Sequence, residues 1–237
     1  MNFVDSELLV SVSRGFGVGI NDEQLENFRL YAELLCVWNE KINLTAITSP
    51  EGIALLHFAD SLTLLSCGSF KEGASLIDVG TGAGFPSVPL CIMRPDMKFT
   101  MMDSLNKRLV FLEQVKDRLG LNFEIVHGRA EELGKKPEYR EQFDFATARA
   151  VAQLNVLSEY CLPFVKPGGS FLAMKGPSGR DETEAAEKAI GLLGGKLSEI
   201  KEFSLGENTR QVVMIDKISP TPERYPRQSG KIKKVPL

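Results

Sequence analysis

Apolar runs of two kinds alternate along most of the chain. Short runs rich in β-branched and aromatic residues predict strands, and longer segments with apolar residues three or four positions apart predict amphipathic helices. Alternating strands and helices are typical of an α/β fold with a parallel sheet. The predicted strands cover residues 75–79, 98–102, 122–126, 143–148, 170–174, 197–205 and 210–218. The predicted helices cover residues 5–15, 22–40, 50–65, 86–93, 104–119, 151–164 and 181–193.

The last two predicted strands are joined by residues 206–209, a short turn that contains a glycine and an asparagine. Such a short connection forces the two strands to be antiparallel. We therefore expect an α/β fold with a mostly parallel seven-stranded sheet that ends in an antiparallel hairpin. We divide the chain into an N-terminal helical extension packed on the core (1–66), a ligand-binding core (67–219) and a basic, proline-containing tail (220–237).

The first predicted strand stops abruptly at a glycine turn. Residues 75–79 form a β-favouring apolar run, and residues 80–84 (GTGAG) follow it directly. Glycines let the backbone turn tightly and approach a ligand closely. The helix that begins near Pro86 then directs its unpaired N–H groups toward that ligand. The next strand ends on Asp103, 23 residues after Gly80, where a carboxylate can accept both hydroxyls of a ribose.

Strand, glycine turn, helix, strand and acid together predict a nucleotide-binding βαβ unit. The alternative is an ordinary tight turn followed by a surface aspartate, and it leaves the agreement of these five features unexplained. The glycines follow a G-x-G-x-G spacing and not the G-x-G-x-x-G spacing of a dinucleotide pyrophosphate loop. The spacing favours an adenosyl ligand without a diphosphate, with a nicotinamide dinucleotide as the alternative.

Composition narrows the class of protein without identifying its ligand. Hydrophobic residues make up 43% of the chain and charged residues 25%, as in an ordinary globular protein. The net charge of −3 gives no overall nucleic-acid signal. The charge is unevenly distributed, however, because residues 223–237 carry five basic side chains against one acidic side chain.

The cysteines and the N-terminus indicate where the protein works. The four cysteines have no paired metal-ligand spacing, so we expect no metal site and a reducing, cytoplasmic compartment. The N-terminus lacks a basic leader followed by an apolar stretch, and no run approaches the roughly 18 apolar residues of a membrane span. We therefore expect no membrane partner. The cysteines are Cys36, Cys67, Cys91 and Cys161.

The glycine turn resembles the first motif of the class I S-adenosylmethionine-dependent methyltransferases. Nearly the whole chain resembles the bacterial 16S ribosomal RNA methyltransferase G family, formerly called glucose-inhibited division protein B. Ser87 departs from the family pattern, in which many members have glycine, but a serine is small enough for the turn. The stretches that carry the resemblance are DVGTGAGFPSVPL (78–90), WNEKINLTAIT (38–48), HFADSL (57–62), MMDSLNKRLVFLE (101–113), HGRAEEL (127–133), TARAVA (147–152), LAMKG (172–176) and RYPR (224–227).

The resemblance implies a Rossmann-like class I methyltransferase fold, S-adenosylmethionine as the cofactor, and methyl transfer to N7 of a guanine in 16S ribosomal RNA. It also assigns cofactor contacts at the predicted carboxyl edge of the sheet. For the adenine contacts, the residues alone fit a helix N-terminus with a dipole-stabilising glutamate equally well. The assigned residues are Gly80, Gly82, Gly84 and Phe85 for the methionine pocket, Asp103 and Ser104 for the ribose, Ala130 and Glu131 for the adenine, and Arg149.

Basic and amide side chains are the candidates for RNA contacts and for placing the target base. An arginine that ends the fourth strand can hold a carboxylate or a phosphate bidentately, or it can pair with a structural acid. The asparagines of residues 38–48 either cap a loop or face substrate, and the tail is either a solvated terminus or an RNA contact. We take Arg149 and Lys175 as catalytic candidates, and Asn39, Asn43, Arg129, Lys175, Arg224 and Arg227 as RNA-binding candidates.

The implied chemistry asks little of the side chains beyond positioning. Guanine N7 carries a lone pair and no proton, so its methylation needs no general base. We interpret His57, which lies among apolar residues, as a buried hydrogen-bonding group. We expect a monomeric enzyme whose partner is 16S ribosomal RNA or a small-subunit intermediate. The alternatives are an NAD(P)-dependent oxidoreductase and a non-catalytic RNA-binding or assembly factor on the same fold.

Overall fold

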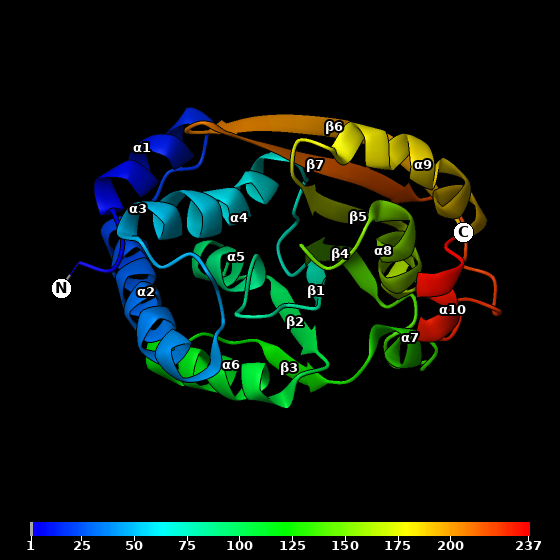
Figure 1. Cartoon of the computed structure of the whole chain (residues 1–237), viewed down its shortest axis with the longest axis horizontal. Helices are drawn as coiled ribbons and strands as arrows, with labels where there is room; N and C mark the ends of the chain where they lie inside the picture. The colour runs from blue at the N-terminus through cyan, green and yellow to red at the C-terminus, as the bar shows by residue number, and fades with distance from the viewer. Residues whose placement is uncertain (1) are drawn as a thin grey trace.

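The structure, a computed structural model, describes residues 2–237. Its centre is a seven-stranded sheet in the order β3-β2-β1-β4-β5-β7-β6 (Figure 1). Strands β1 to β5 run parallel, and β7 pairs antiparallel with both β5 and β6, which confirms the predicted sheet and its terminal hairpin. The strands are β1 Ser75–Val79, β2 Lys98–Asp103, β3 Glu124–His127, β4 Phe143–Arg149, β5 Val165–Lys175, β6 Gly195–Leu205 and β7 Asn208–Lys217.

Helices connect and cover the strands (Figure 1). Each helix within residues 2–237 is too short or too polar to cross a bilayer. The α-helices are α1 Ser6–Gly15, α2 Asp22–Ile42, α3 Pro50–Gly52, α4 Asp60–Leu62, α5 Ser87–Met93, α6 Asn106–Leu119, α7 Ala130–Leu133, α8 Leu154–Cys161, α9 Gly179–Leu192 and α10 Ser229–Lys234. A π-helical segment, η1 Ile53–Ala59, and two 3-10 segments, η2 Thr63–Ser66 and η3 Leu162–Phe164, complete the helical part.

Successive strand residues face two different cores, because side chains alternate across a strand. Leu76 of β1 and Met101 of β2 pack with the N-terminal helices, including the fully buried Phe28 of α2. Ile77 and Met102 point to the opposite face and pack with residues of α8 and α9. The N-terminal helices therefore close one face of the sheet, and the later helices close the other.

The longest helix, α2, begins and ends where its capping residues place it. The side chain of Asn21 accepts a hydrogen bond from the Gln24 amide at 2.8 Å, and the Gln24 side chain accepts one from the Asn21 amide at 3.0 Å. This reciprocal capping box confirms the start predicted at Asn21. The helix ends at Asn43, whose φ of +50° is left-handed.

Three local features depart from what their residue patterns indicate. Leu105 is 45% exposed, because it lies one residue before α6 and outside the apolar face of that helix. Residues 166–169 do not end a helix but form a bulge within β5. Phe143 and Phe145 of β4 pair with β5 on either side of this bulge. The tail is not extended: it contains α10, and its Ile232 is fully buried.

Gly84, at the end of the glycine turn, is a packing position. Its φ is +96°, and a Cβ at this residue would lie 2.5 Å from Cγ2 of Val88, 2.9 Å from Cδ2 of Leu112 and 2.9 Å from Oη of Tyr31. No real Cβ is found so close to other heavy atoms. Helices α2, α5 and α6 therefore approach one another at Gly84 only because it has no side chain.

We expect Gly84→Ala to lower the free energy of unfolding by about 2–4 kcal/mol, because left-handed strain adds to overpacking. Urea unfolding monitored by circular dichroism measures this loss. Gly120→Ala is the matched control, since Gly120 has a φ of +62° but open space around its Cβ position. It should cost only about 1–2 kcal/mol. Equal losses for the two variants would show that the packing contact is unimportant.

Candidate active site

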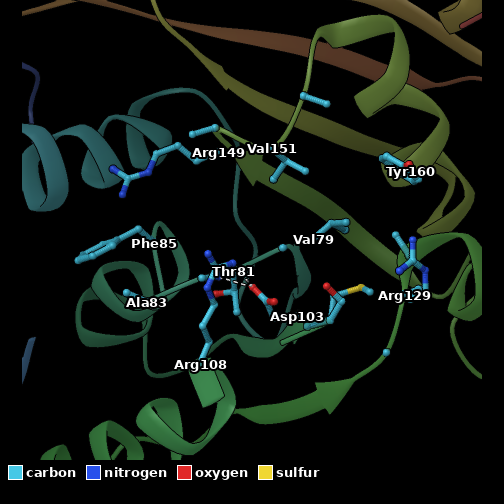
Figure 2. Close-up of a pocket in the computed structure, with 18 of the residues that line it drawn as sticks. Val79, Thr81, Ala83, Phe85, Asp103, Arg108, Arg129, Arg149, Val151 and Tyr160 are labelled. Carbon is cyan, nitrogen blue, oxygen red and sulfur yellow. Dashed lines mark hydrogen bonds and ion pairs between the residues drawn. The ribbon is translucent and has the colours of Figure 1, made fainter. Parts of the chain in front are cut away.

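A cavity of about 450 Å³ lies at the carboxyl ends of β1, β2 and β4 (Figure 2). In an open parallel sheet, ligands bind at this edge. The glycine turn after β1, the end of β2, the start of α7 and the loop after β4 line the cavity. Its volume fits an adenosyl ligand, because small-molecule sites span about 300–1,000 Å³.

The glycine turn bends over the end of β2. The amides of Gly80 and Thr81 both donate to the carbonyl of Met102, at 2.9 and 3.0 Å. Gly80 and Gly82 have φ values of +77° and +61°, which glycine adopts without steric cost. A Cβ on Gly80 would lie 3.0 Å from Cγ2 of Val151, so the missing side chain also lets the loop after β4 approach.

Asp103 ends β2 and is 3% exposed, and its carboxylate is fixed from three sides (Figure 2). Oδ2 accepts hydrogen bonds from the Gly82 amide at 3.0 Å and from Nη1 of Arg108 at 3.1 Å. Oδ1 accepts one from the Leu105 amide at 2.9 Å. Because a carboxylate oxygen can accept about two hydrogen bonds, Oδ1 keeps capacity for a further donor such as a ribose hydroxyl.

Asp78 lies below the glycine turn and is fully buried. Burial raises the pKa of this carboxyl to about 7, although the Thr81 hydroxyl donates to its Oδ2 at 2.8 Å and opposes the shift. Its Oδ1 has no hydrogen-bond partner within residues 2–237. Asp78 does not belong to the cavity lining, so the acid that faces the ligand is Asp103, which can accept a hydroxyl of the adenosyl group. The cavity therefore fits this cofactor in size and in chemistry.

The end of the cavity beside α7 is lined by Ala130, the first residue of that helix, and by Glu131. Glu131 is 9% exposed, and its Oε1 accepts a hydrogen bond from Nε of Arg129 at 2.6 Å. Arg129 is half-exposed at the rim. Tyr160 of α8 forms the facing wall (Figure 2).

The C-terminal helix α10 contributes to the same end of the cavity. Ser229 and Lys233 both belong to its lining. The Ser229 hydroxyl lies 3.1 Å from Oη of Tyr160, which joins α10 to α8. Neither residue is a site candidate on sequence grounds, because nothing in the local pattern of the tail indicates a ligand contact.

Arg149, the last residue of β4, is held by the N-terminal helices. Its Nη1 donates to the carbonyl of Leu56 at 2.9 Å and to Oδ2 of Asp60 at 3.1 Å. Its Nη2 contacts Nδ1 of His57 at 3.2 Å, and the guanidinium lies 4.8 Å from the ring centre of Phe85. The guanidinium therefore pairs with an acid, yet it still lines the cavity.

His57 is neutral and fully engaged. Burial and, to a lesser extent, the Arg149 charge lower the pKa of His57 to about 3. Because a guanidinium only donates, Nδ1 accepts from Arg149, and Nε2 carries the proton toward Oγ1 of Thr45 at 2.8 Å. The ring stacks on Phe85 with a centroid distance of 4.4 Å. The interpretation of His57 as a buried hydrogen-bonding group is confirmed, but His57 also lines the cavity.

A second cavity of about 630 Å³ adjoins the first. The two cavities share His57, Arg149 and residues 150–152. Burial raises the pKa of Asp60 in the second cavity, even though Arg149 and Arg210 face its carboxylate and oppose the shift. The charged side chains that line this cavity are Arg149, Lys175, Arg210, Asp60 and Glu182.

The loop after β4 is fastened by an ion pair. Residues 150–153, which the sequence predicts as the start of a helix, form this loop and separate the two cavities. Nζ of Lys175 donates to the carbonyl of Ala152 at 2.7 Å and lies 2.7 Å from Oε2 of Glu182. The same Oε2 accepts from the Leu154 amide at 2.9 Å. The Lys175 side chain is only 8% exposed, so it faces inward and not toward solvent.

The remaining RNA-binding candidates lie outside both cavities. Oδ1 of Asn39 accepts from the Thr45 amide at 2.8 Å, and Asn43 provides the left-handed turn after α2, so both shape the loop that carries Thr45. The Arg224 guanidinium stacks on the Tyr225 ring and is exposed. Arg227 turns inward and pairs with a buried acid, an arrangement that the basic tail does not predict.

The structure brings most of the cofactor candidates together. Gly84, expected in the methionine pocket, lies between two cavity-lining residues, Ala83 and Phe85, and itself packs between helices. Arg108, Thr45 and Tyr160 line the cavity without having been predicted, because their approach depends on the tertiary fold. The candidates that line the cavity are Gly80, Gly82, Phe85, Asp103, Ser104, Ala130, Glu131 and Arg149, and Arg129 lies at its rim.

Solved structures similar to this chain have the same fold. An S-adenosylmethionine-dependent methyltransferase from Aquifex aeolicus is 22% identical with a TM-score of 0.53, and the match covers 70% of this chain and 93% of that chain. TYW2 of M. jannaschii in complex with AdoMet is 12% identical with a TM-score of 0.52, over 63% of this chain and 72% of that chain. These likenesses confirm the class I methyltransferase fold.

Sequence relatives are much closer. The ribosomal RNA small subunit methyltransferases G of Alkaliphilus metalliredigens and Acetivibrio thermocellus are 49% and 50% identical, and the matches cover 93% and 98% of this chain and 94% and 96% of the relatives. The family model described as rRNA small subunit methyltransferase G matches residues 24–213. This match replaces the alternative interpretation of the chain as an oxidoreductase. The chain belongs to the rRNA small subunit methyltransferase G family, a family of S-adenosylmethionine-dependent enzymes.

Proposed function

We propose that this protein transfers a methyl group from S-adenosylmethionine to N7 of a guanine in 16S ribosomal RNA of the small ribosomal subunit. Family membership supports the reaction class. Within the structure, the proposal is carried by the two adjoining cavities at the carboxyl edge of the sheet, which share His57, Arg149 and residues 150–152. One has the size and the polar groups for an adenosyl ligand, and the other has room for a nucleotide base.

The first cavity is the proposed cofactor site, where S-adenosylmethionine supplies an electrophilic methyl group. Asp103 would accept one ribose hydroxyl through Oδ1, while its Oδ2 keeps the glycine turn in place. Gly80, Gly82 and Phe85 line the end of the cavity nearest Arg149, where we place the methionine group. Ala130 and Glu131 line the opposite end, where we place the adenine.

The second cavity is the proposed site of the target guanine. Three cationic side chains and two carboxylates line it, and they form ion pairs with one another: Arg149 and Arg210 with Asp60, and Lys175 with Glu182. One positive charge is left in excess, which suits a nucleotide with its phosphate. Ile47, Leu56 and Met174 add apolar surface on which a base can pack. The base would lie against the loop 150–152, beside the methyl donor.

Reaction at N7 fits the groups at the junction of the cavities. N7 offers a lone pair and carries no proton, so the chain contributes by holding two reactants in line and not by removing a proton. His57 is neutral, and both of its ring nitrogens are engaged, by Arg149 and by Thr45. Its imidazole therefore serves as a rigid wall and does not compete with the base as a nucleophile.

We propose further that the substrate is the ribosomal RNA within the small subunit or one of its assembly intermediates, and that the protein acts on it as a monomer in the cytoplasm. Exposed basic residues near the cavities supply phosphate contacts. Arg129 at the rim and Arg224 on the tail are the candidates whose guanidinium groups are open to solvent.

Nucleoside analysis tests the proposed function. Purified protein is incubated with methyl-labelled S-adenosylmethionine and either small ribosomal subunits or protein-free 16S RNA, and the RNA is digested and separated by mass spectrometry. We expect label in 7-methylguanosine alone. Label in a different nucleoside would overturn the N7 assignment. RNA binding without any incorporation would favour a non-catalytic assembly factor.

Asp103→Asn is the single substitution that tests the cofactor assignment most directly. We expect the Kd for S-adenosylhomocysteine to rise about 10–100-fold, because hydrogen bonds to a charged acceptor contribute about 1.5–3 kcal/mol. Isothermal titration calorimetry measures it. Asp96→Asn is the control, since Asp96 pairs with Arg94 away from both cavities and its loss should leave the Kd unchanged. An unchanged Kd for Asp103→Asn would show that the ribose does not bind at this position.

For Lys175 we propose a positioning role in place of a phosphate contact. Its ammonium is occupied by the Ala152 carbonyl and by Glu182, and the latter also holds the Leu154 amide. The pair thus fixes the α8 end of the loop against which the base would lie. An RNA phosphate could reach Lys175 only by displacing these buried contacts.

Lys175→Met should therefore lower kcat by at least about tenfold, because small misplacements of a reactant cost up to about 100-fold. RNA affinity and its salt dependence should stay the same. Glu182→Gln should act alike, and the double variant should be no worse than either single one. Filter binding over a salt series checks this, with Lys188→Met on the exposed side of α9 as control. A salt slope reduced by about one in Lys175→Met would instead identify a phosphate contact.

A further inference from the structure

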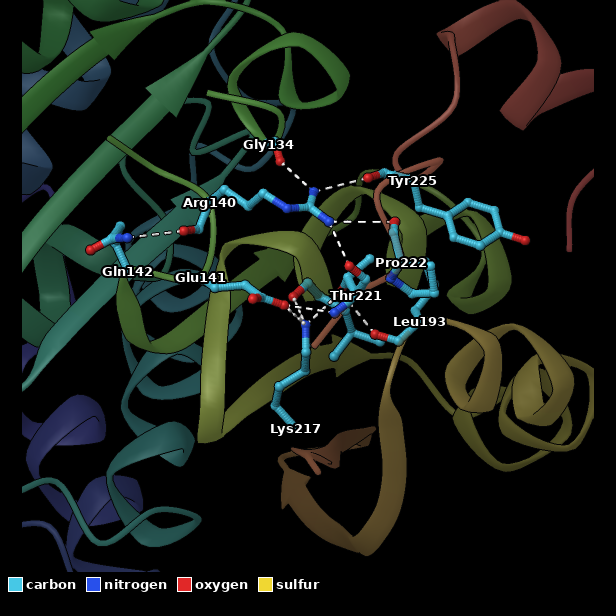
Figure 3. A network of polar contacts seen from close by, with 10 residues as sticks. Gly134, Arg140, Glu141, Gln142, Leu193, Lys217, Thr221, Pro222 and Tyr225 are labelled. Carbon is cyan, nitrogen blue, oxygen red and sulfur yellow. Dashed lines mark hydrogen bonds and ion pairs between the residues drawn. The ribbon is translucent and has the colours of Figure 1, made fainter. Parts of the chain in front are cut away.

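The segment that follows β7, residues 218–237, is fastened to the body of the protein by buried charged groups. It leaves the sheet at Lys217, passes the end of α9, and ends in α10, which packs on α8 (Figures 1 and 3). A tail of this composition is expected to be solvated and mobile. Here three separate anchors hold it, built on Lys217, on Arg140 and on the pair of Arg227 with Glu159.

The first anchor is Lys217, which is 1% exposed (Figure 3). Its Nζ donates to the Leu162 carbonyl at 2.8 Å and to the Thr221 hydroxyl, and lies 3.1 Å from Oε1 of Glu141. Oε1 of Glu141 also accepts from the Thr221 amide at 2.6 Å. Burial lowers the pKa of Lys217 to about 8, and the Glu141 carboxylate opposes the shift.

The second anchor is Arg140, whose guanidinium collects backbone carbonyls (Figure 3). Nη1 donates to the carbonyls of Gly134 at 3.0 Å and Tyr225 at 2.9 Å. Nη2 donates to those of Thr221 at 2.6 Å and Pro222 at 3.4 Å. One side chain thereby ties the segment after α7 to three residues of the tail.

The third anchor is the pair of Arg227 with Glu159 of α8. Glu159 is fully buried, and its carboxylate accepts from the Arg227 amide at 2.8 Å, from Nε at 2.9 Å and from Nη2 at 2.6 Å. The Arg227 side chain is 14% exposed. A buried carboxylate that depends on one arginine makes that contact obligatory, because an unpaired buried charge is strongly destabilising.

These anchors hold α10 in place. Ile232 is fully buried against the core beneath it, and Ser229 reaches Tyr160. Ser229 and Lys233 thereby come to line the cofactor cavity, at the end that also holds Glu131. Ser229 follows Arg227 by only two residues, so the position of Arg227 sets the position of Ser229.

We propose that residues 218–237 form the adenine-side wall of the cofactor site, with Ser229 contacting the bound adenosyl group and Arg227 acting as the positioning residue that seats the wall. The inference rests on the proposed assignment of the first cavity to S-adenosylmethionine. It gives Arg227 a role in cofactor binding in place of the RNA phosphate contact that its charge suggests.

Calorimetric titration of S-adenosylhomocysteine into the full-length protein tests the wall. We expect Arg227→Gln to raise the Kd by about tenfold, comparable with the loss of a buried polar contact. We expect Ser229→Trp to raise it by at least about tenfold, because the indole occupies space in the cavity. The salt slope of RNA binding should be unchanged in both. Lys231→Gln, an exposed position on α10 outside the cavity, should bind as wild type does.

Arg227→Gln leaves Glu159 buried and unpaired, so general destabilisation has to be separated from a local effect. The double variant Arg227→Gln with Glu159→Gln replaces the ion pair by two neutral amides, and we expect it to recover thermal stability more fully than cofactor affinity. Hydrogen exchange should then locate increased exchange in residues 218–237 and not in the strands. Ser229→Trp changes none of the three anchors, so its thermal midpoint should fall by less than that of Arg227→Gln.

Two results would overturn the proposal. If Ser229→Trp and Arg227→Gln both bind S-adenosylhomocysteine like the wild type, the tail is not part of the cofactor site. If Arg227→Gln instead weakens RNA binding and lowers its salt slope by about one at unchanged cofactor affinity, Arg227 is a phosphate contact. Failure of the underlying cofactor assignment looks different, because then the wild type itself does not bind or Asp103→Asn has no effect.

Discussion

The hydrogen bond from the Gly82 amide to the Asp103 carboxylate, at 3.0 Å, is the contact on which the site depends. Together with the two amides that donate to Met102, it holds the turn after β1 across the end of β2. The same carboxylate has a free acceptor position toward the cavity. Fold and binding thus share one buried acid, which fixes the loop through contacts within the chain.

Residues 75–103 could be predicted from sequence because everything in that unit is local. An apolar run, a glycine turn, a helix and an acid follow one another, and each is recognisable from its own residues. The wall of the site is different. His57 meets Arg149 across 92 positions and Tyr160 meets Ser229 across 69, so no periodicity or spacing connects them. These contacts exist only because the sheet brings distant segments to one edge.

Charge is the other point at which sequence and structure differ. From sequence, basic residues such as Lys175, Arg149 and Arg227 suggest an RNA-binding surface. In the structure, each of these three charged groups is paired with a carboxylate inside the protein. The sequence signal for the pairing of Arg227 lies in its acidic partner. Glu159 is the one charged residue of its helix, and an acid at a buried helical position requires a cationic partner. A search for lone acids in apolar helices would have found the partner of Arg227.

The course of the chain through the cavity has a consequence for how the enzyme is made. Ser229 and Lys233 line a space whose other walls come from β1, β2, α7 and the loop after β4. In the order of translation these two residues come after every strand of the sheet. A nascent chain can therefore complete its sheet while the cofactor cavity is still open on one side. The cavity gains these two lining residues only after the chain of every strand has been synthesised.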